Sequence, residues 1–126
     1  MEIITDVDCG NSINLFRNTN VVSTESVKIK KLSSFLSKLK KPIFLKIDVQ
    51  GYELEVLKGA DLNQIQYIYL EASYLKLYDS QPLIKDIIKY LSNRNFKLTG
   101  EYNLVKKNNN KIQADFLFKN NKIKYE

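Results

Sequence analysis

Two apolar runs separated by a segment of helix length constrain the fold of this 126-residue chain more than any other feature. Residues 43–49 form a nearly continuous apolar run, and residues 67–72 form a second one. Such runs are typical of strands covered on both faces, as in a parallel sheet. Between them, residues 52–58 have Glu53 and Glu55 in the first turns and Lys58 in the last, which favours a helix that Gly59 can terminate. The pattern predicts a strand–helix–strand unit.

The flanking segments extend this alternation. Residues 27–32 alternate apolar with polar residues, which predicts a short edge strand, and Ser33 can cap a helix that runs to Lys40, before Pro42. After the second run, Asp79 or Ser80 can cap a helix that has Pro82 in its first turn and ends near residue 93. Two further strands, at residues 96–103 and 112–118, are joined by an asparagine-rich turn at residues 106–111.

These elements predict an α/β fold with a mostly parallel sheet and a C-terminal antiparallel β-hairpin. We expect residues 1–22 to be a poorly patterned lead-in, residues 23–119 to form the domain, and residues 120–126 to be a frayed tail. In such a sheet, ligands bind beyond the carboxyl ends of the strands.

Composition excludes several kinds of chemistry. The chain has no histidine and one cysteine, Cys9, which rules out histidine bases, histidine-ligated zinc, internal disulfides and cysteine-clustered zinc. The net charge is +6, but only two of the 20 basic residues are arginines and the lysines are scattered, so we expect no nucleic-acid partner. No run is long enough to cross a membrane and no export signal is visible, which indicates a cytoplasmic protein.

Three charged residues interrupt the two apolar runs. Lys46 and Asp48 share one face of the first predicted strand, and Glu71 lies at the matching end of the second. If the strands are neighbours, the two carboxylates flank one crevice, with the ammonium between or beneath them. This arrangement suits a catalytic site, and it suits a structural ion pair equally well, so spacing alone leaves both interpretations open.

The loops that follow the strands supply further candidates. Tyr52 and Glu53 follow the Gly51 turn at the start of a helix, where an acid is also favoured by the helix dipole alone. Tyr74, after Glu71, lies where it can line a substrate entrance or pack onto a helix.

The segment of residues 45–60, LKIDVQGYELEVLKGA, closely resembles the LKIDVEG-x-E-x-x-VLKGA signature of FkbM-type S-adenosylmethionine-dependent methyltransferases. The resemblance extends over residues 23–119. It implies the C-terminal half of a partial Rossmann-like (class I) methyltransferase that transfers a methyl group to a hydroxyl of a small molecule or sugar. It also implies S-adenosylmethionine as cofactor, Asp48, Glu71 and Lys46 as catalytic candidates, and the acceptor at Gln50, Gly51, Tyr52, Glu53 and Tyr74.

Two departures from this signature shape the functional expectation. Gln50 stands where the family usually has glutamate, and no strand–turn–helix with a glycine-rich cofactor turn precedes residue 43, although residues 6–11 superficially echo one. We therefore expect a truncated chain that binds the cofactor weakly by itself. It would pair with a separate N-terminal half or with a second copy through an exposed sheet edge. The alternative is a non-catalytic scaffold of the same fold.

Overall fold

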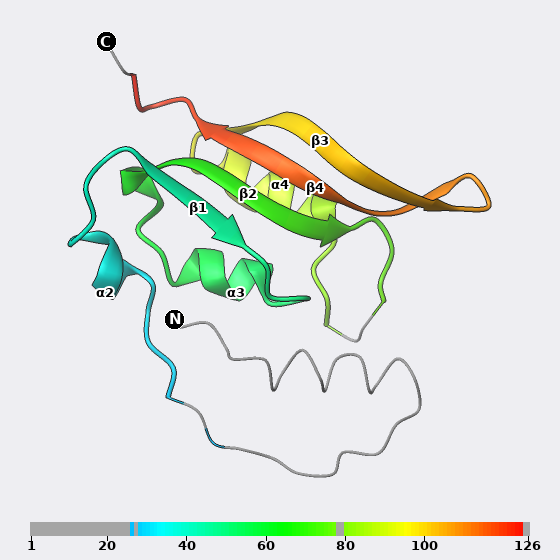
Figure 1. Ribbon diagram of the computed structural model, residues 1–126, viewed down its shortest axis with the longest axis horizontal. Coiled ribbons are helices and arrows are strands. Elements are labelled where there is room, and N and C mark those ends of the chain that lie inside the picture. The colour runs from blue at the N-terminus through cyan, green and yellow to red at the C-terminus, as the bar shows by residue number, and fades with distance from the viewer. Residues whose placement is uncertain (1–25, 27, 78–79, 125–126) are drawn as a thin grey trace.

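A four-stranded sheet forms the centre of the computed structural model, which describes residues 26, 28–77 and 80–124 (Figure 1). The strands lie in the order β1-β2-β4-β3, with bounds Ile43–Ile47 for β1, Ile65–Ser73 for β2, Phe96–Lys107 for β3 and Asn110–Asn120 for β4. The helices are α2 (Ser33–Leu36), α3 (Glu53–Lys58) and α4 (Ile84–Ser92), with a 3₁₀ turn, η1, at Leu62–Gln64. Among the described residues, no helix is long and apolar enough to cross a membrane.

The expectation of a mostly parallel sheet is wrong for this part of the chain, although the α/β class and the closing hairpin are confirmed. β1 and β2 pair in parallel, but β4 pairs antiparallel with both β2 and β3. The reason is the position of the hairpin. The crossover through α4 does bring β3 back in the direction of β2, but β4 then folds into the gap between them and replaces a parallel neighbour.

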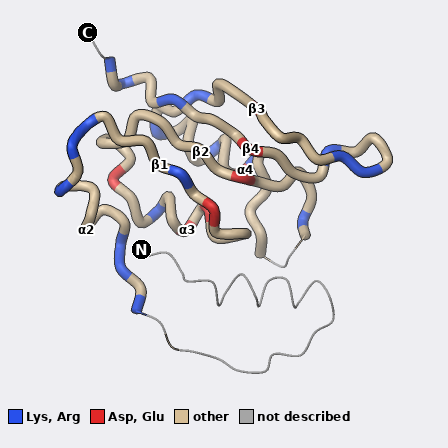
Figure 2. Tube along the Cα trace, viewed as in Figure 1, with Lys and Arg blue, Asp and Glu red and all other residues tan. Residues whose placement is uncertain are grey.

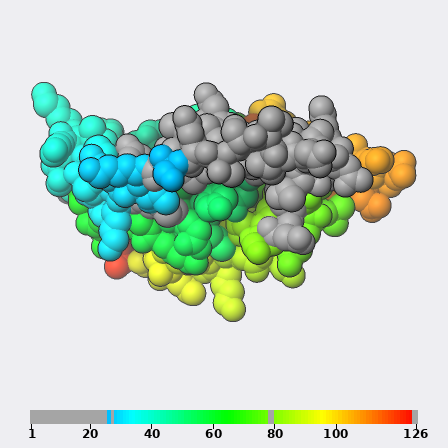
Figure 3. Space-filling view, turned by 90° about the horizontal axis from the view of Figure 1, so that it is seen from below, coloured from blue at the N-terminus to red at the C-terminus, as the bar shows by residue number. Residues whose placement is uncertain are grey.

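One face of the sheet carries the hydrophobic core. Alternate residues of the two central strands are buried there, including Leu70, Phe116 and Phe118, and they pack in one cluster with apolar residues of α3 and α4. α2, α3 and α4 are visible in cyan, green and yellow-green from the same side of the molecule (Figure 3). The core therefore lies between the sheet and its helices.

The opposite face of the sheet stays largely accessible, which corrects the expectation that β1 is covered on both sides. Phe44 is 59% exposed, and Lys46 is exposed on the same face of β1, whereas Ile43 and Ile47 are buried on the other. The continuous apolar run suggested two covered faces because Phe44 looks like a core residue. In the structure its ring instead lies 6.3 Å from that of Tyr67, across the open face.

The N-terminal elements are shorter than expected. Residues 28–31 form no strand, and the first helix, α2, ends at Leu36 instead of Lys40. The proposed lead-in at residues 1–22, including the glycine-containing residues 6–11, lies outside the described residues, as does Asp79.

The start of α4 is set by a different residue from the one expected. Its first turn is held by the Asp86 carboxylate, which accepts a hydrogen bond of 3.0 Å from the Leu83 amide. Pro82 precedes the helix and is not within its first turn, because Leu83 is extended and bridges to Ser73 of β2. The helix ends at Ser92, next to the predicted end.

The hairpin is longer than the sequence pattern indicates. Its turn is the two asparagines Asn108 and Asn109, both with positive φ, a conformation that asparagine tolerates better than most residues. β4 continues to Asn120, which belongs to the core and not to a frayed tail. The Asn120 side chain is 2% exposed and donates a hydrogen bond of 3.0 Å to the carbonyl of Ile65.

Candidate functional site

The carboxyl ends of β1 and β2 open into a hollow of about 290 Å³ that is lined mainly by charged and polar residues. Lys46 and Asp48 come from β1 and the residues directly after it, and Glu71 comes from the end of β2. Because β1 and β2 are parallel neighbours, their carboxyl ends meet at one edge of the sheet. We call this the acidic hollow; its lining is Lys46, Ile47, Asp48, Tyr69, Glu71 and Asp115. The structure thus brings together the three residues that interrupt the apolar runs.

The acidic hollow is not built around a lysine–carboxylate ion pair. In the described part of the chain, the ion pairs join Lys58 to Glu55 and Lys111 to Glu101, and Lys46 is in neither. The structural ion pair that the spacing allowed is therefore absent among these residues. Lys46 aside, groups of lysines lie in the loop before β1 and at the tip of the hairpin, away from the acidic groups at the carboxyl ends of β1 and β2 (Figure 2).

Glu71 is a carboxylate whose pKa is raised by its surroundings in the acidic hollow. Partial desolvation raises its pKa, and the negative charges of Asp115, Asp48 and Glu53 raise it further. Asp115 lies directly opposite Glu71 in the β2–β4 register. The charges that shift this pKa therefore all belong to acidic residues, and Lys46 is not among them. A carboxylate with a raised pKa is better matched to accepting a proton near neutral pH.

The Asp115 carboxylate is held in place by two neighbours on the open face of the sheet. Its Oδ2 atom accepts hydrogen bonds from the Tyr69 hydroxyl, at 2.9 Å, and from the Asn103 amide, at 2.6 Å. The Asp115 charge raises the pKa of Tyr69 in turn, mainly through this hydrogen bond. The two contacts fix a negative charge beside Glu71.

A strained turn links β1 to α3 and shapes a second hollow. Gln50 has φ of 46° and Gly51 has φ of 111°, so two successive residues adopt left-handed conformations. Glycine does so at little cost, whereas glutamine does not. The turn is fastened by Glu53, whose Oε1 atom accepts a hydrogen bond of 3.0 Å from the Gly51 amide. Strain of this kind often accompanies functional sites.

The second hollow, of about 180 Å³, adjoins the first and shares Glu71 with it. We call it the amide hollow because Gln50, Gln81 and Gln113 supply three side-chain amides; its other lining residues are Glu53, Glu71, Ala72, Ser73 and Leu77. Gln81 is satisfied internally, since its Nε2 atom donates to Ser73 Oγ at 3.0 Å and its Oε1 atom accepts from the Leu77 amide at 2.8 Å. The Oε1 atom of Gln50, in contrast, is buried and has no hydrogen-bond partner among the described residues.

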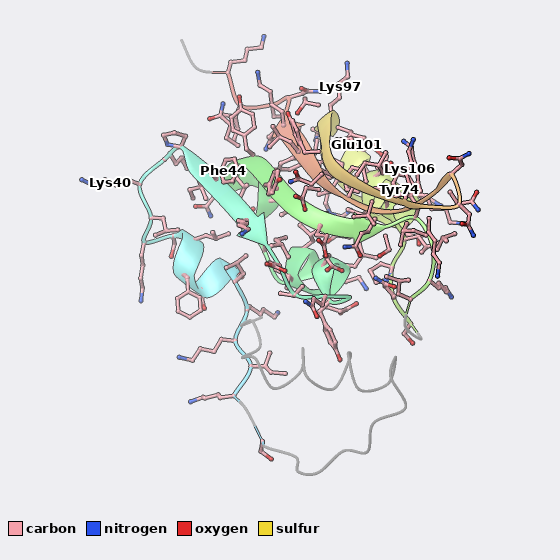
Figure 4. All side chains as sticks on the ribbon, turned by 45° about the vertical axis from the view of Figure 1, so that its right-hand side comes forward. Lys40, Phe44, Tyr74, Lys97, Glu101 and Lys106 are labelled. Carbon is pink, nitrogen blue, oxygen red and sulfur yellow. The ribbon has the colours of Figure 1, made fainter. Side chains whose placement is uncertain are left out.

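Tyr74 does not line either hollow. Its hydroxyl donates a hydrogen bond of 2.7 Å to Glu101 Oε2, and its ring meets that of Phe116 edge-on at 5.8 Å (Figure 4). Lys111 lies within hydrogen-bond distance of Glu101 at 3.1 Å and stands over the Tyr74 ring at 5.1 Å. These contacts join the loop after β2 to the hairpin, which indicates a structural role.

The remaining predicted residues lie at the amide hollow, in the turn beside it or on the surface. Gln50 and Glu53 line the amide hollow, and Gly51 forms the turn behind it, whereas Tyr52 is 45% exposed and lines neither hollow.

Sequence reasoning missed several residues around the hollows: Tyr69, Gln81, Gln113 and Asp115. Asp115 could have been found from the sequence, because it lies between Ala114 and Phe116, which are buried on one face of the strand. The alternation of side chains places Asp115 on the opposite face. Its relation to Glu71 depends on the pairing of β4 with β2, which local pattern does not specify.

We expect the stability of the protein to fall with rising pH through Glu53. This side chain is only 4% exposed, and burial raises its pKa above 4.5, opposed in part by the Gly51 hydrogen bond and assisted by Asp48. The folded state therefore binds the proton more tightly than the unfolded chain. The stability contribution is full below pH 4.5 and is lost as pH rises through the folded pKa. Glu53→Gln, which keeps an acceptor for Gly51, should remove this loss.

Urea unfolding at several pH values between 4 and 8 measures this effect. The free energy of unfolding of Glu53→Gln, minus that of the unchanged protein, should grow with pH. The matched control is Glu55→Gln on the same helix, where the carboxylate is half exposed and the difference should stay flat. A flat difference for Glu53→Gln as well would contradict the raised pKa.

Comparison with known proteins identifies one family. Residues 4–98 match the model of the methyltransferase FkbM domain. This match covers β1 and β2, whose carboxyl ends open into the acidic hollow, together with Asp48, Gln50, Glu53 and Glu71, but not Asp115 of β4. It begins before the resemblance seen in the sequence and ends within β3. No curated protein and no solved structure matches the chain.

Proposed function

Because this chain belongs to the FkbM methyltransferase family, we propose that it takes part in S-adenosylmethionine-dependent methyl transfer to a hydroxyl group of a small molecule or sugar. The observation that carries the proposal is the meeting of Asp48 and Glu71 around one hollow at the carboxyl ends of two parallel strands. Open α/β sheets bind ligands at this edge. The strand order β1-β2-β4-β3 is consistent with one half of a Rossmann-like methyltransferase sheet.

The chain's own residues would act on the acceptor. We assign Glu71 as the general base, because desolvation and its acidic neighbours raise its pKa toward the working range of a base. The acceptor O–H bond would break as its proton passes to the Glu71 carboxylate, and the oxygen would form a bond to the methyl group. S-adenosylmethionine, when bound, would supply that methyl group through its S–CH3 bond and would leave as the neutral thioether. Asp48, the other carboxylate among the catalytic candidates, would help to hold the pKa of Glu71 high through its charge, and Lys46 would orient the acceptor.

The described residues do not fit the whole cofactor. Nucleotide-like cofactors need a glycine-containing turn that lets the backbone approach them. The described glycines are Gly51 and Gly59, at the two ends of α3, and Gly100 within β3. None of them forms such a cradle, so we assign no residue of the described part to the nucleoside or its carboxylate.

We expect this chain alone to bind S-adenosylmethionine weakly or not at all, because it shows no cradle for the cofactor among the described residues. Isothermal titration calorimetry of the full chain should give no saturation at about 100 μM cofactor, a range that an ordinary cofactor site would saturate. Micromolar binding would contradict this expectation.

The free edge of β1 is the place where we propose a partner joins. Within the described residues, β1 pairs with β2 alone, so its other edge presents unpaired backbone groups. A separate N-terminal half or a second copy of this chain could add a strand there. Light scattering at high protein concentration tests this: a species larger than one chain is expected, and a sharp monomer contradicts it.

Methyl transfer is tested directly with isotopically labelled S-adenosylmethionine at millimolar concentration and a panel of hydroxyl-bearing small molecules and sugars. We expect labelled product that depends on Glu71, detected by mass spectrometry. Absence of Glu71-dependent product, in the chain alone and with its partner half, would instead favour a non-catalytic scaffold of the same fold.

A further inference from the structure

The buried amide oxygen of Gln50 is a polar atom that forms no hydrogen bond with the part of the chain that the structure describes. An unpaired buried acceptor lowers stability, because its hydration is lost and nothing replaces it. Here the atom lies beside a hollow of about 180 Å³, on a residue held at a φ of 46° that glutamine rarely adopts. Both costs are concentrated on one side chain at the edge of the candidate site.

The groups around Gln50 indicate what kind of ligand atom would complete it. Gln81 donates to Ser73 Oγ and accepts from the Leu77 amide, and Glu53 Oε1 accepts from the Gly51 amide. The oxygen atoms left to meet a ligand belong mainly to Gln50 and Glu71, and oxygens of amides and carboxylates accept hydrogen bonds. A ligand that pairs with these oxygen atoms must therefore donate hydrogen bonds.

Charge narrows the ligand class further. Glu53 and Glu71 line the amide hollow itself, and Asp48 and Asp115 lie in the adjoining acidic hollow. A phosphate or carboxylate group placed among them would be repelled. A neutral hydroxyl or an ammonium group would not.

We propose that Gln50 is a specificity-determining residue, whose buried amide oxygen accepts a hydrogen bond from a hydroxyl or ammonium group of the methyl acceptor. The amide hollow then takes neutral or cationic acceptors that carry hydrogen-bond donors and excludes phosphorylated ones. This inference rests on the proposed function for the identity of the ligand as an acceptor, but its test requires no methyl transfer.

The binding test uses the full chain labelled with ¹⁵N and three small probes: glycerol, ethanolamine and glycerol 3-phosphate. Glycerol and ethanolamine should shift the Gly51 backbone amide and the side-chain amides of Gln50 and Gln113. Dissociation constants on the order of 10 mM are expected for ligands this small. Glycerol 3-phosphate, at matched ionic strength, should shift none of these signals. Equal shifts from glycerol and its phosphate would overturn the proposed exclusion of anions.

Two substitutions of Gln50 separate recognition from structure. Gln50→Met keeps the length of the side chain but removes the acceptor, so probe binding, followed at Gly51 and Gln113, should weaken about fivefold, the effect of one typical hydrogen bond. Gln50→Glu keeps an acceptor oxygen and should retain ethanolamine binding. The control is Gln64→Met in η1, where the amide donates to Asp61 at 2.9 Å outside both hollows, and probe binding should not change.

Stability gives a second, independent readout. If the Gln50 oxygen is unpaired until a ligand binds, Gln50→Met removes an unsatisfied acceptor from the free protein. The urea concentration at the midpoint of unfolding should then rise or stay the same, while the affinity for the probes falls. A lower midpoint would mean that the oxygen already supports the fold, and it would overturn the proposal, as would unchanged probe binding. A Glu71→Gln variant that leaves methyl transfer unchanged would contradict the assignment of Glu71 as the general base. It would not contradict the proposed role of Gln50 in acceptor recognition.

Discussion

Phe116→Ala should lower the free energy of unfolding by about 3–5 kcal/mol, the usual cost of truncating a large buried aromatic side chain. Phe116 is 1% exposed in the middle of β4, within the core cluster, and its ring contacts that of Tyr74. Few neighbours can move to fill the space, because β4 is bonded to a strand on each side. Natural domains have only about 5–15 kcal/mol of stability, so the loss would be a large part of the total.

The matched control is Phe44→Ala, which removes the same atoms from the open face of the sheet. Phe44 is 59% exposed, and its removal should cost no more than about 1 kcal/mol. Chemical unfolding followed by circular dichroism measures both variants. Similar losses at the two positions would contradict a sheet with one buried face. A large loss at Phe44 alone would mean that something covers the open face in solution.

The two phenylalanines also show how far sequence pattern could predict this fold. Local signals were sufficient where a segment's own residues decide its structure. The β1 strand, the α3 helix between Gly51 and Gly59, and the hairpin all lie close to their predicted positions. Each depends on neighbours in sequence: apolar runs, end charges and turn residues.

The local sequence pattern could not predict which distant segments pair in the sheet. β4 pairs with β2, which is distant from it in sequence. This pairing makes the sheet mostly antiparallel and places Asp115 opposite Glu71. The sequence pattern also wrongly predicted that Phe44 is buried. A large apolar residue gives the same pattern in a strand whether or not that face of the sheet is covered.

The candidate site was predicted in part for the same reason. Lys46, Asp48 and Glu71 could be placed together because parallel strands bring their carboxyl ends to one edge. Tyr74 could not be placed, because its orientation depends on Glu101 and Lys111, which are distant in sequence. The unpaired oxygen of Gln50 depends on the strained turn and could be seen only in three dimensions.

Glu71→Gln should lower the rate of methyl transfer about 10²- to 10⁴-fold, the usual contribution of a general base. The amide has the size and hydrogen-bonding reach of the carboxylate but cannot take up the proton of the acceptor. The measurement is kcat/KM for the acceptor that gives labelled product. The matched control is Glu55→Gln, a half-exposed carboxylate on α3 that lines neither hollow, which should leave the rate unchanged.

The pH profile distinguishes a base from a residue that only maintains the shape of the site. Because a base must be ionised, the rate should rise with pH through the pKa of Glu71, which desolvation, Asp115, Asp48 and Glu53 hold above its ordinary value. Asp48→Asn removes one of these negative charges, so it should move the acidic limb of the profile to lower pH. If Asp48→Asn abolishes transfer while Glu71→Gln retains it, the roles are reversed and Asp48 is the base. An unshifted limb in Asp48→Asn would mean that the group that titrates in the profile is not Glu71.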